Sequence, residues 1–204
     1  GAASYGALNT SAAAGVSLTG GAITLSGAVT TANSGPVTIV NSGALTIAGD
    51  MTLDGAFTQS GGGAVSTGGD ITMSSAAAIL FTNDVTLTGD VSYNSAGADI
   101  TFSGDINGAF GLTIDSCVDG TVTLNDVGQT VELTTVTVST DDLVTLGTIS
   151  TTGLQSFISC GGTIDLCGTY DTGGADFIVT GNADLICDTT IITEGGLISF
   201  TGTV

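Results

Sequence analysis

The chain has 204 residues and carries 19 Asp and Glu but no Lys, Arg or His, which gives a formal net charge of −19 at pH 7. The missing cations exclude a phosphate clamp, a nucleic-acid footprint and a polybasic membrane patch. The missing His excludes Ser-His-Asp and Cys-His catalysis and any imidazole metal ligand. We therefore expect a protein that is not an enzyme and has no nucleic-acid partner.

The rest of the composition is that of strands and turns. Hydrophobic residues make up 42% of the chain, which is too apolar for a disordered acidic tail. Gly is abundant and Pro occurs once, at Pro36, a pattern that favours strands and turns over helices. The longest apolar run, 76–81, is far shorter than the roughly 20 residues that span a bilayer, so no membrane insertion is expected. The chain begins with Gly1 and shows no secretion leader, which indicates a processed product or an excised fragment.

A recurring phrase, apolar-Thr-apolar, predicts short strands along the whole chain. Its copies lie, in chain order, at 23–25, 37–39, 45–47, 51–53, 71–73, 85–87, 100–102, 112–114, 122–124, 136–138 and 144–146. In each copy the two apolar side chains point to one face of the strand and Thr points to the other. Gly, Asn, Ser and Asp residues on either side of the phrase keep the strands short.

The sequence also repeats over a longer period than that of the strand phrase. Gly-Asp pairs end at Asp50, Asp70 and Asp90, which are evenly spaced in the sequence. Their period, near 20 with two or three short strands in each repeat, is typical of a β-solenoid, in which each repeat forms one coil. We therefore predict one all-β domain over residues 1–204, a parallel β-helix (β-solenoid) with about 20 residues per coil and roughly ten coils. The alternative is a β-sandwich, but the hairpin dipeptides and aromatic anchors typical of that fold are scarce here.

The three Gly-Asp carboxylates, Asp50, Asp70 and Asp90, form the candidate metal site. In a regular register of one coil per repeat they stack about 5 Å apart, where like charges repel by roughly 1 kcal/mol even in water. Calcium takes oxygen ligands only and is therefore the candidate cofactor between them. The alternative is that Gly-Asp forms turns with solvated carboxylates, because the calcium-binding nonapeptide pattern is missing from the sequence.

Four cysteines lie in the second half of the chain, and none forms a zinc-like C-x-x-C pair. Cys167 and Cys187 differ by one coil length, so we expect either a disulfide or two thiols buried in the core. Cys117 and Cys160 are farther apart in the sequence, by a length that corresponds to two coils. A separation of two coils is about 9.6 Å, so we expect these two to be too far apart for a direct bridge.

Two features suggest other functions and are better explained as structure. The pair Asp141-Asp142 resembles the acid and base of polygalacturonase-like hydrolases, but this chain lacks the Gly-His-Gly and Arg-x-Lys elements of those enzymes. Outward Thr rows suggest ice binding, yet Thr-x-Thr pairs such as Thr121/Thr123 are sporadic. A polysaccharide-active enzyme and ice binding are therefore minor alternatives.

The strand rhythm of 112–115, 120–128, 136–138 and 148–153 resembles the β-strand repeats of filamentous-haemagglutinin-like adhesins and autotransporter passengers. This resemblance covers most of residues 20–204 and lies in composition and rhythm. It implies a right-handed parallel β-helix that is displayed at, or released from, a bacterial surface. The missing Lys and Arg depart from such repeats, which usually contain some.

Both ends of the chain read as coils without a cap. Residues 1–49 carry no charged side chain, and 197–200 reads as one more strand. Because an open coil exposes unpaired backbone groups, we expect such ends to meet another copy head to tail. The sequence therefore predicts a structural subunit of an extracellular or cell-surface filament. The alternative is an adhesin passenger fragment that binds a surface ligand.

Overall fold

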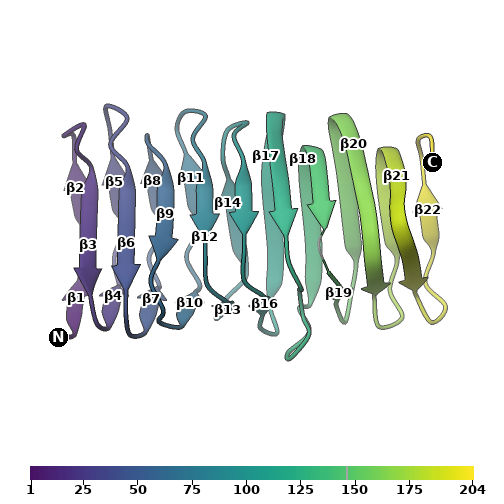
Figure 1. Cartoon of the computed structure of the whole chain (residues 1–204), viewed down its shortest axis with the longest axis horizontal. Coiled ribbons are helices and arrows are strands. Elements are labelled where there is room, and N and C mark those ends of the chain that lie inside the picture. Colours follow the sequence, from purple (N-terminus) through teal and green to yellow (C-terminus); the bar gives the residue numbers. More distant parts are fainter. Residues whose placement is uncertain (146) are drawn as a thin grey trace.

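The computed structural model describes residues 1–145 and 147–204 and forms an all-β solenoid of about 9 turns with about 21 residues per turn. Figure 1 shows the coils stacked in sequence order along one axis, with the two ends of the chain at opposite ends of the stack. Every strand pair described is parallel. The predicted β-solenoid is therefore confirmed, and the alternative β-sandwich is wrong, since a sandwich requires antiparallel sheets.

Three ladders of strands run along the stack. The first contains β1 (Ala3–Tyr5), β4 (Ile23–Leu25), β7 (Leu45–Ile47), β10 (Val65–Thr67), β13 (Val85–Leu87) and β16 (Ile106–Asn107). The second contains β2 (Leu8–Thr10), β5 (Val29–Thr31), β8 (Met51–Leu53), β11 (Ile71–Met73) and β14 (Val91–Asn94). The third contains β3 (Val16–Gly20), β6 (Val37–Asn41), β9 (Phe57–Ser60), β12 (Ile79–Phe81) and β15 (Ile100–Phe102).

The second half of the chain uses long strands that bend around the corners between ladders. These strands are β17 (Gly111–Leu124), β18 (Thr135–Thr145), β20 (Gln155–Asp171) and β21 (Phe177–Ile192), with the short β19 (Ile149–Ser150) and β22 (Ile198–Phe200). At such a corner one strand continues from one ladder into the next. The register of its pairing with the neighbouring coil shifts at that point. The predicted strand 144–146 ends on Leu146, which lies outside the described residues.

Alternation of side chains builds one core along the whole stack. In β4, Ile23 and Leu25 are buried and Thr24 between them faces outward, as the strand phrase predicts. The outward residues stack in turn, with Thr24 beside Thr46 and Thr46 beside Ser66. Because the buried aliphatic side chains form one continuous cluster, each coil covers the core of the next.

Aromatic side chains strengthen this core at two points. Phe81 lies 5.0 Å, centroid to centroid, from both Phe57 and Phe102, and 5.8 Å from Tyr93. A second group forms around Phe177 in the later coils. The sequence shows few aromatics, but the stacked register brings residues from successive coils together.

Replacing Phe81 should show how strongly one coil depends on its neighbours. Phe81→Ala removes the ring between three others and leaves a cavity, so we expect a loss of about 3–5 kcal/mol in the free energy of unfolding. Urea unfolding followed by circular dichroism measures it. Val40→Ala, on the outward side of β6, is the control and should change stability by less than about 0.5 kcal/mol. Equal effects of the two changes would contradict the core assignment.

Candidate functional site

The carboxylates at the corners accept hydrogen bonds from the backbone of the next coil. Asp50 Oδ1 accepts from the N–H of Asp70 at 3.1 Å, and Asp70 Oδ1 accepts from the N–H of Ser92 at 2.8 Å. Asp90 Oδ1 accepts from the N–H of Gly111 at 2.8 Å. At a corner the chain leaves the strand ladder, so a backbone N–H lacks its usual carbonyl partner. The Asp side chain supplies the missing acceptor.

The uniform column of Asp50, Asp70 and Asp90 is not what the structure contains. Asp50 lies below Asp70, because Met51 pairs with Ile71. Ile71, however, pairs with Tyr93, so Asp70 lies opposite Ser92 and Asp90 belongs to the corner that precedes this pair. The cause is a slip in pairing between β11 and β14, which a strictly constant period cannot represent.

The three carboxylates of the predicted calcium site consequently do not stack in one column as expected. Within the described part of the chain, no group of three or more Asp, Glu or Cys side chains is placed to hold a metal ion. Asp70 and Asp90 instead line one open groove of about 530 Å³. The rest of its lining consists of Val91, Ser92, Gly111, Thr113, Thr134 and Thr135. Calcium binding by these carboxylates stays a prediction.

A regular column of carboxylates does exist, at Asp84, Asp105 and Asp126. Each of these residues precedes a first-ladder position, and the pairs Val85 with Ile106 and Ile106 with Val127 hold them in register. Asp84 Oδ1 accepts from the N–H of Asp105 at 3.0 Å. Sequence reasoning missed this column because its spacing is one residue longer than that of the Gly-Asp pairs and Gly precedes only one of the three.

The environment shifts the pKa of two carboxylates in opposite directions. Partial burial, followed by the charges of Asp84 and Asp126, raises the pKa of Asp105. Hydrogen bonds from the Ser34 N–H and from the hydroxyls of Ser75 and Ser74 lower the pKa of Asp54. Partial burial and stacked charge therefore oppose folding with Asp105 in its charged form, whereas hydrogen bonding of the charged form favours folding at Asp54.

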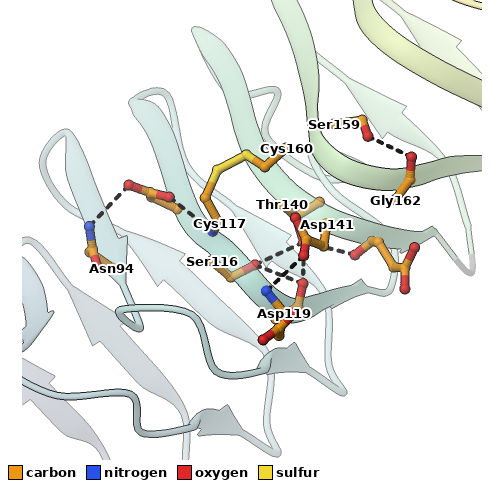
Figure 2. Close-up of a disulfide and its surroundings, with 12 residues drawn as sticks. Asn94, Ser116, Cys117, Asp119, Thr140, Asp141, Ser159, Cys160 and Gly162 are labelled. Atoms are coloured by element: carbon orange, nitrogen blue, oxygen red, sulfur yellow. Dashed lines mark hydrogen bonds between the residues drawn. A yellow bond between two sulfur atoms is a disulfide. The ribbon is translucent and has the colours of Figure 1, made fainter.

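Four cysteines form two disulfides in the structure. Cys167–Cys187 joins neighbouring coils with a Cα–Cα distance of 5.0 Å, which confirms the predicted disulfide over the alternative of buried thiols. Cys117–Cys160 is also bonded, with a Cα–Cα distance of 5.6 Å, so the expectation that these residues are too far apart is wrong. Figure 2 draws this second bond beside Ser116, Thr140 and Ser159, one residue from each of three successive coils.

Unequal corners explain how Cys117 reaches Cys160 across an intervening coil. The pairing of β17 with β18 resumes at Thr121 and Asp142, so the β17 corner comprises 117–120, whereas the β18 corner opposite it is Asp141 alone. The corner of β20 is likewise longer than that of β18. The two long corners extend over the short one and meet. The expectation of a wide separation assumes a uniform coil height, and that assumption does not hold here.

The adjacent carboxylates Asp141 and Asp142 lie at the same corner of β18. Asp141 Oδ2 accepts from the N–H of Asp119 at 2.7 Å, and Asp142 Oδ1 accepts from the N–H of Thr163 at 3.2 Å. Each carboxylate is thus engaged with the backbone of a neighbouring coil, one on each side. This arrangement agrees with the interpretation of the pair as part of a turn.

Comparison of the chain with models of protein families, with curated proteins and with solved structures finds no match. Among residues 1–145 and 147–204, no helix is long and apolar enough to cross a membrane.

The opposite pKa shifts predict opposite responses to removing a charge. The folded state holds the Asp105 proton to a higher pH than the unfolded chain does, so the contribution of Asp105 to stability falls as pH rises through its raised pKa. Asp105→Asn keeps an oxygen for Asn125 and should raise the unfolding temperature at pH 7. This gain should shrink toward acidic pH, where the wild-type carboxyl is protonated. Thermal unfolding by circular dichroism at several pH values measures it.

Asp54→Asn is the matched comparison at another corner. Its lowered pKa stabilises the fold at neutral pH, and that contribution is lost as pH falls through the folded pKa. The variant should therefore lower the unfolding temperature at pH 7. A shift of the same sign for both variants would contradict the assigned environments.

Proposed function

We propose that this chain is a structural subunit of an extracellular or cell-surface filament that assembles end to end through its terminal coils. The observation that carries the proposal is the unbroken parallel stack, in which successive coils repeat the same ladders around one aliphatic core. Hydrogen bonds between coils run along the stack, and the core continues through it, so the coils form a stiff rod.

The chemistry of the chain suits a persistent extracellular material. Disulfides form and persist in oxidising environments, and this chain has two. With no Lys or Arg, the chain offers trypsin-like proteases no cleavage site. These features support the proposed location outside the cell.

The proposed contact joins the last coil of one copy to the first coil of the next. At the last coil, Leu197 is 58% exposed and Ile198 is 46% exposed. Ile198 pairs in register with Phe177, a core residue, so it occupies a position that is buried in preceding coils. A further coil would cover it, and residues 1–49 bring no carboxylate to such a contact. Head-to-tail stacking of this kind builds an open fibre.

The second candidate function is an adhesin passenger fragment, which the resemblance to adhesin repeats also suggests. It is favoured by the open grooves with hydroxyl and carboxylate linings. The groove beside Asp70 and Asp90 is one, and another of about 500 Å³ lies beside the segment 128–132. A ligand held by hydrogen bonds would suit such linings. Binding to a glycan array by monomers that form no fibres would favour this candidate over the filament.

A charge placed at the end of the stack should block assembly. Ile198→Asp puts a carboxylate where the next coil would pack, so we expect fibres of the wild type, seen by negative-stain electron microscopy, to be lost. Ser199→Asp, the next residue of β22 and on its opposite side, is the control and should still assemble. Circular dichroism verifies that both variants fold. Wild-type protein that stays monomeric at high concentration would refute the proposal.

Lateral association of the rods should depend on ions. With a formal charge of −19, the side faces repel one another at low salt, and salt screens this repulsion within about 10 Å at 0.1 M. We therefore expect fibres to bundle at high salt, and at lower concentration with calcium than with sodium because calcium also bridges carboxylates. Light scattering during titration measures this, with Asp70→Asn/Asp90→Asn testing those two carboxylates. Bundling that is indifferent to both ions would contradict the expectation.

A further inference from the structure

We propose that the Cys117–Cys160 disulfide is a reducible latch that holds the coil of β18 between its neighbours and limits how far the rod extends under tension. This inference rests on the proposed structural function, because it assigns a regulation to the same rod. It starts from the position of the bond. β17 and β20 each pair with β18, so the bond joins two coils through a third.

The backbone ladder holds the three coils together on one side of the corner. Ser116 pairs with Thr140, and Thr140 pairs with Ser159. Ser116 Oγ donates to Thr140 Oγ1 at 2.8 Å (Figure 2). Thr140 Oγ1 in turn donates to the Gly120 carbonyl at 2.8 Å. Beyond this point the register shifts, and the disulfide is the link that reaches across all three coils.

The corner that carries Cys117 is held in a strained conformation. Val118 and Asp119 have φ angles of 79° and 73°, a left-handed region that is a genuine outlier for a β-branched residue. The Val118 side chain is 72% exposed, so packing does not hold it there. Hydrogen bonds from the N–H of Asp119 to Asp141 and from the N–H of Cys117 to Asp115 hold the corner, together with the disulfide.

The close approach of Gly97 to this corner fixes its position from the preceding coil. Gly97 has a φ of 97°, and a Cβ added there would lie 2.3 Å from the carbonyl oxygen of Val118. Only a residue without a side chain leaves room for the corner in its present place. The corner is therefore confined on one side by Gly97 and on the other by the coil of β18.

Reduction of the latch proceeds by ordinary thiol–disulfide exchange. A dithiol reductant attacks as its thiolate at Cys160, which is exposed, and the Cys160–Cys117 bond breaks. Cys117 leaves as a thiolate and takes up a proton. The second thiol of the reductant then displaces Cys160 and closes its own disulfide, so two electrons pass from the reductant to the two protein cysteines. The strained corner is then free to relax.

The two disulfides differ in how readily they re-form. Cys167 and Cys187 lie on directly paired strands, and although the register shifts at Cys167, the pairs on either side of it, Leu166 with Leu185 and Gly168 with Thr189, join the two coils directly. That ladder keeps the two thiols together after reduction, at a high effective concentration. Cys117 and Cys160 lack a ladder of their own, because each of their strands pairs with β18 at this level. We therefore expect the Cys117–Cys160 bond to be reduced first.

The latch sets the length of chain that tension can release. The sequence separation of 43 between Cys117 and Cys160 corresponds to about 150 Å of extended chain. While the bond is closed, a force on the two ends of the chain bypasses this segment. Once the bond is open, the coil of β18 can unravel with the rest.

Single-molecule force spectroscopy tests the proposal on the full chain placed between marker domains of known length. With a graded dose of dithiothreitol, unfolding should lengthen first by about 150 Å, and a further step of about 70 Å should follow at higher dose as the separation of 20 between Cys167 and Cys187 is released. Cys117→Ser/Cys160→Ser should show the longer extension without reductant. Cys167→Ser/Cys187→Ser is the control and should keep the longer of the two steps under reductant. Appearance of the shorter step at the lower dose would overturn the proposal.

Thiol labelling tests the latch without any force. After reduction at increasing dithiothreitol and alkylation, mass spectrometry should find Cys117 and Cys160 labelled at lower reductant than the other two cysteines. Val118→Gly relieves the left-handed strain and should shift the labelling of Cys117 to higher reductant. If the labelling of Cys117 did not shift, the left-handed corner would place no strain on the Cys117–Cys160 bond, and this part of the proposal would be wrong. Thiol labelling does not require fibres. The latch can therefore be tested, and can fail, independently of the proposed filament function.

Discussion

The structure depends on the parallel hydrogen bonds that join each coil to the next. Every backbone donor of a coil needs an acceptor one coil away, and strands meet this need until the chain turns a corner. There the carboxylates of Asp50, Asp70, Asp84 and Asp90 take the place of the missing carbonyl. Lys and Arg only donate hydrogen bonds, so neither could fill this role. The role of Asp at the corners agrees with an acidic composition that contains no cations.

Using charged acceptors has a consequence for how coils stack. Identical corners would place carboxylates in a column, as happens at Asp84, Asp105 and Asp126, where partial burial, followed by the neighbouring charges, raises the pKa of Asp105. Between Asp70 and Asp90 the slip in register avoids this, because a backbone N–H of Ser92 stands where the next carboxylate would be. Variation in corner length thus separates like charges in part of the stack.

The sequence predicts the strands better than the corners, for a physical reason. Alternation of apolar and Thr residues decides which side chains are buried, and this locates elements such as β4 and predicts the solenoid fold. Corner length is not encoded by alternation, since corners of different length can turn the chain equally well. The constant Gly-Asp spacing therefore predicts a slightly short coil, with about ten turns where there are about 9. It also predicts a column of Asp50, Asp70 and Asp90, which in the structure ends at Asp70. A search for Asp before each first-ladder strand would have found Asp84 and Asp105.

The same reasoning explains why both disulfides lie where they do. The ladder shifts register between Ser116 and Thr121, and again between Leu166 and Gly168. Cys117 and Cys167 fall inside these two intervals, where backbone pairing between coils is interrupted. In the first half of the chain, short strands and Gly-containing turns restore pairing at each new strand. In the second half, strands bend through the corners, and covalent bonds join the coils at the points that the ladder leaves unpaired. All four cysteines therefore lie in the half of the rod where strands bend through the corners and the pairing register shifts.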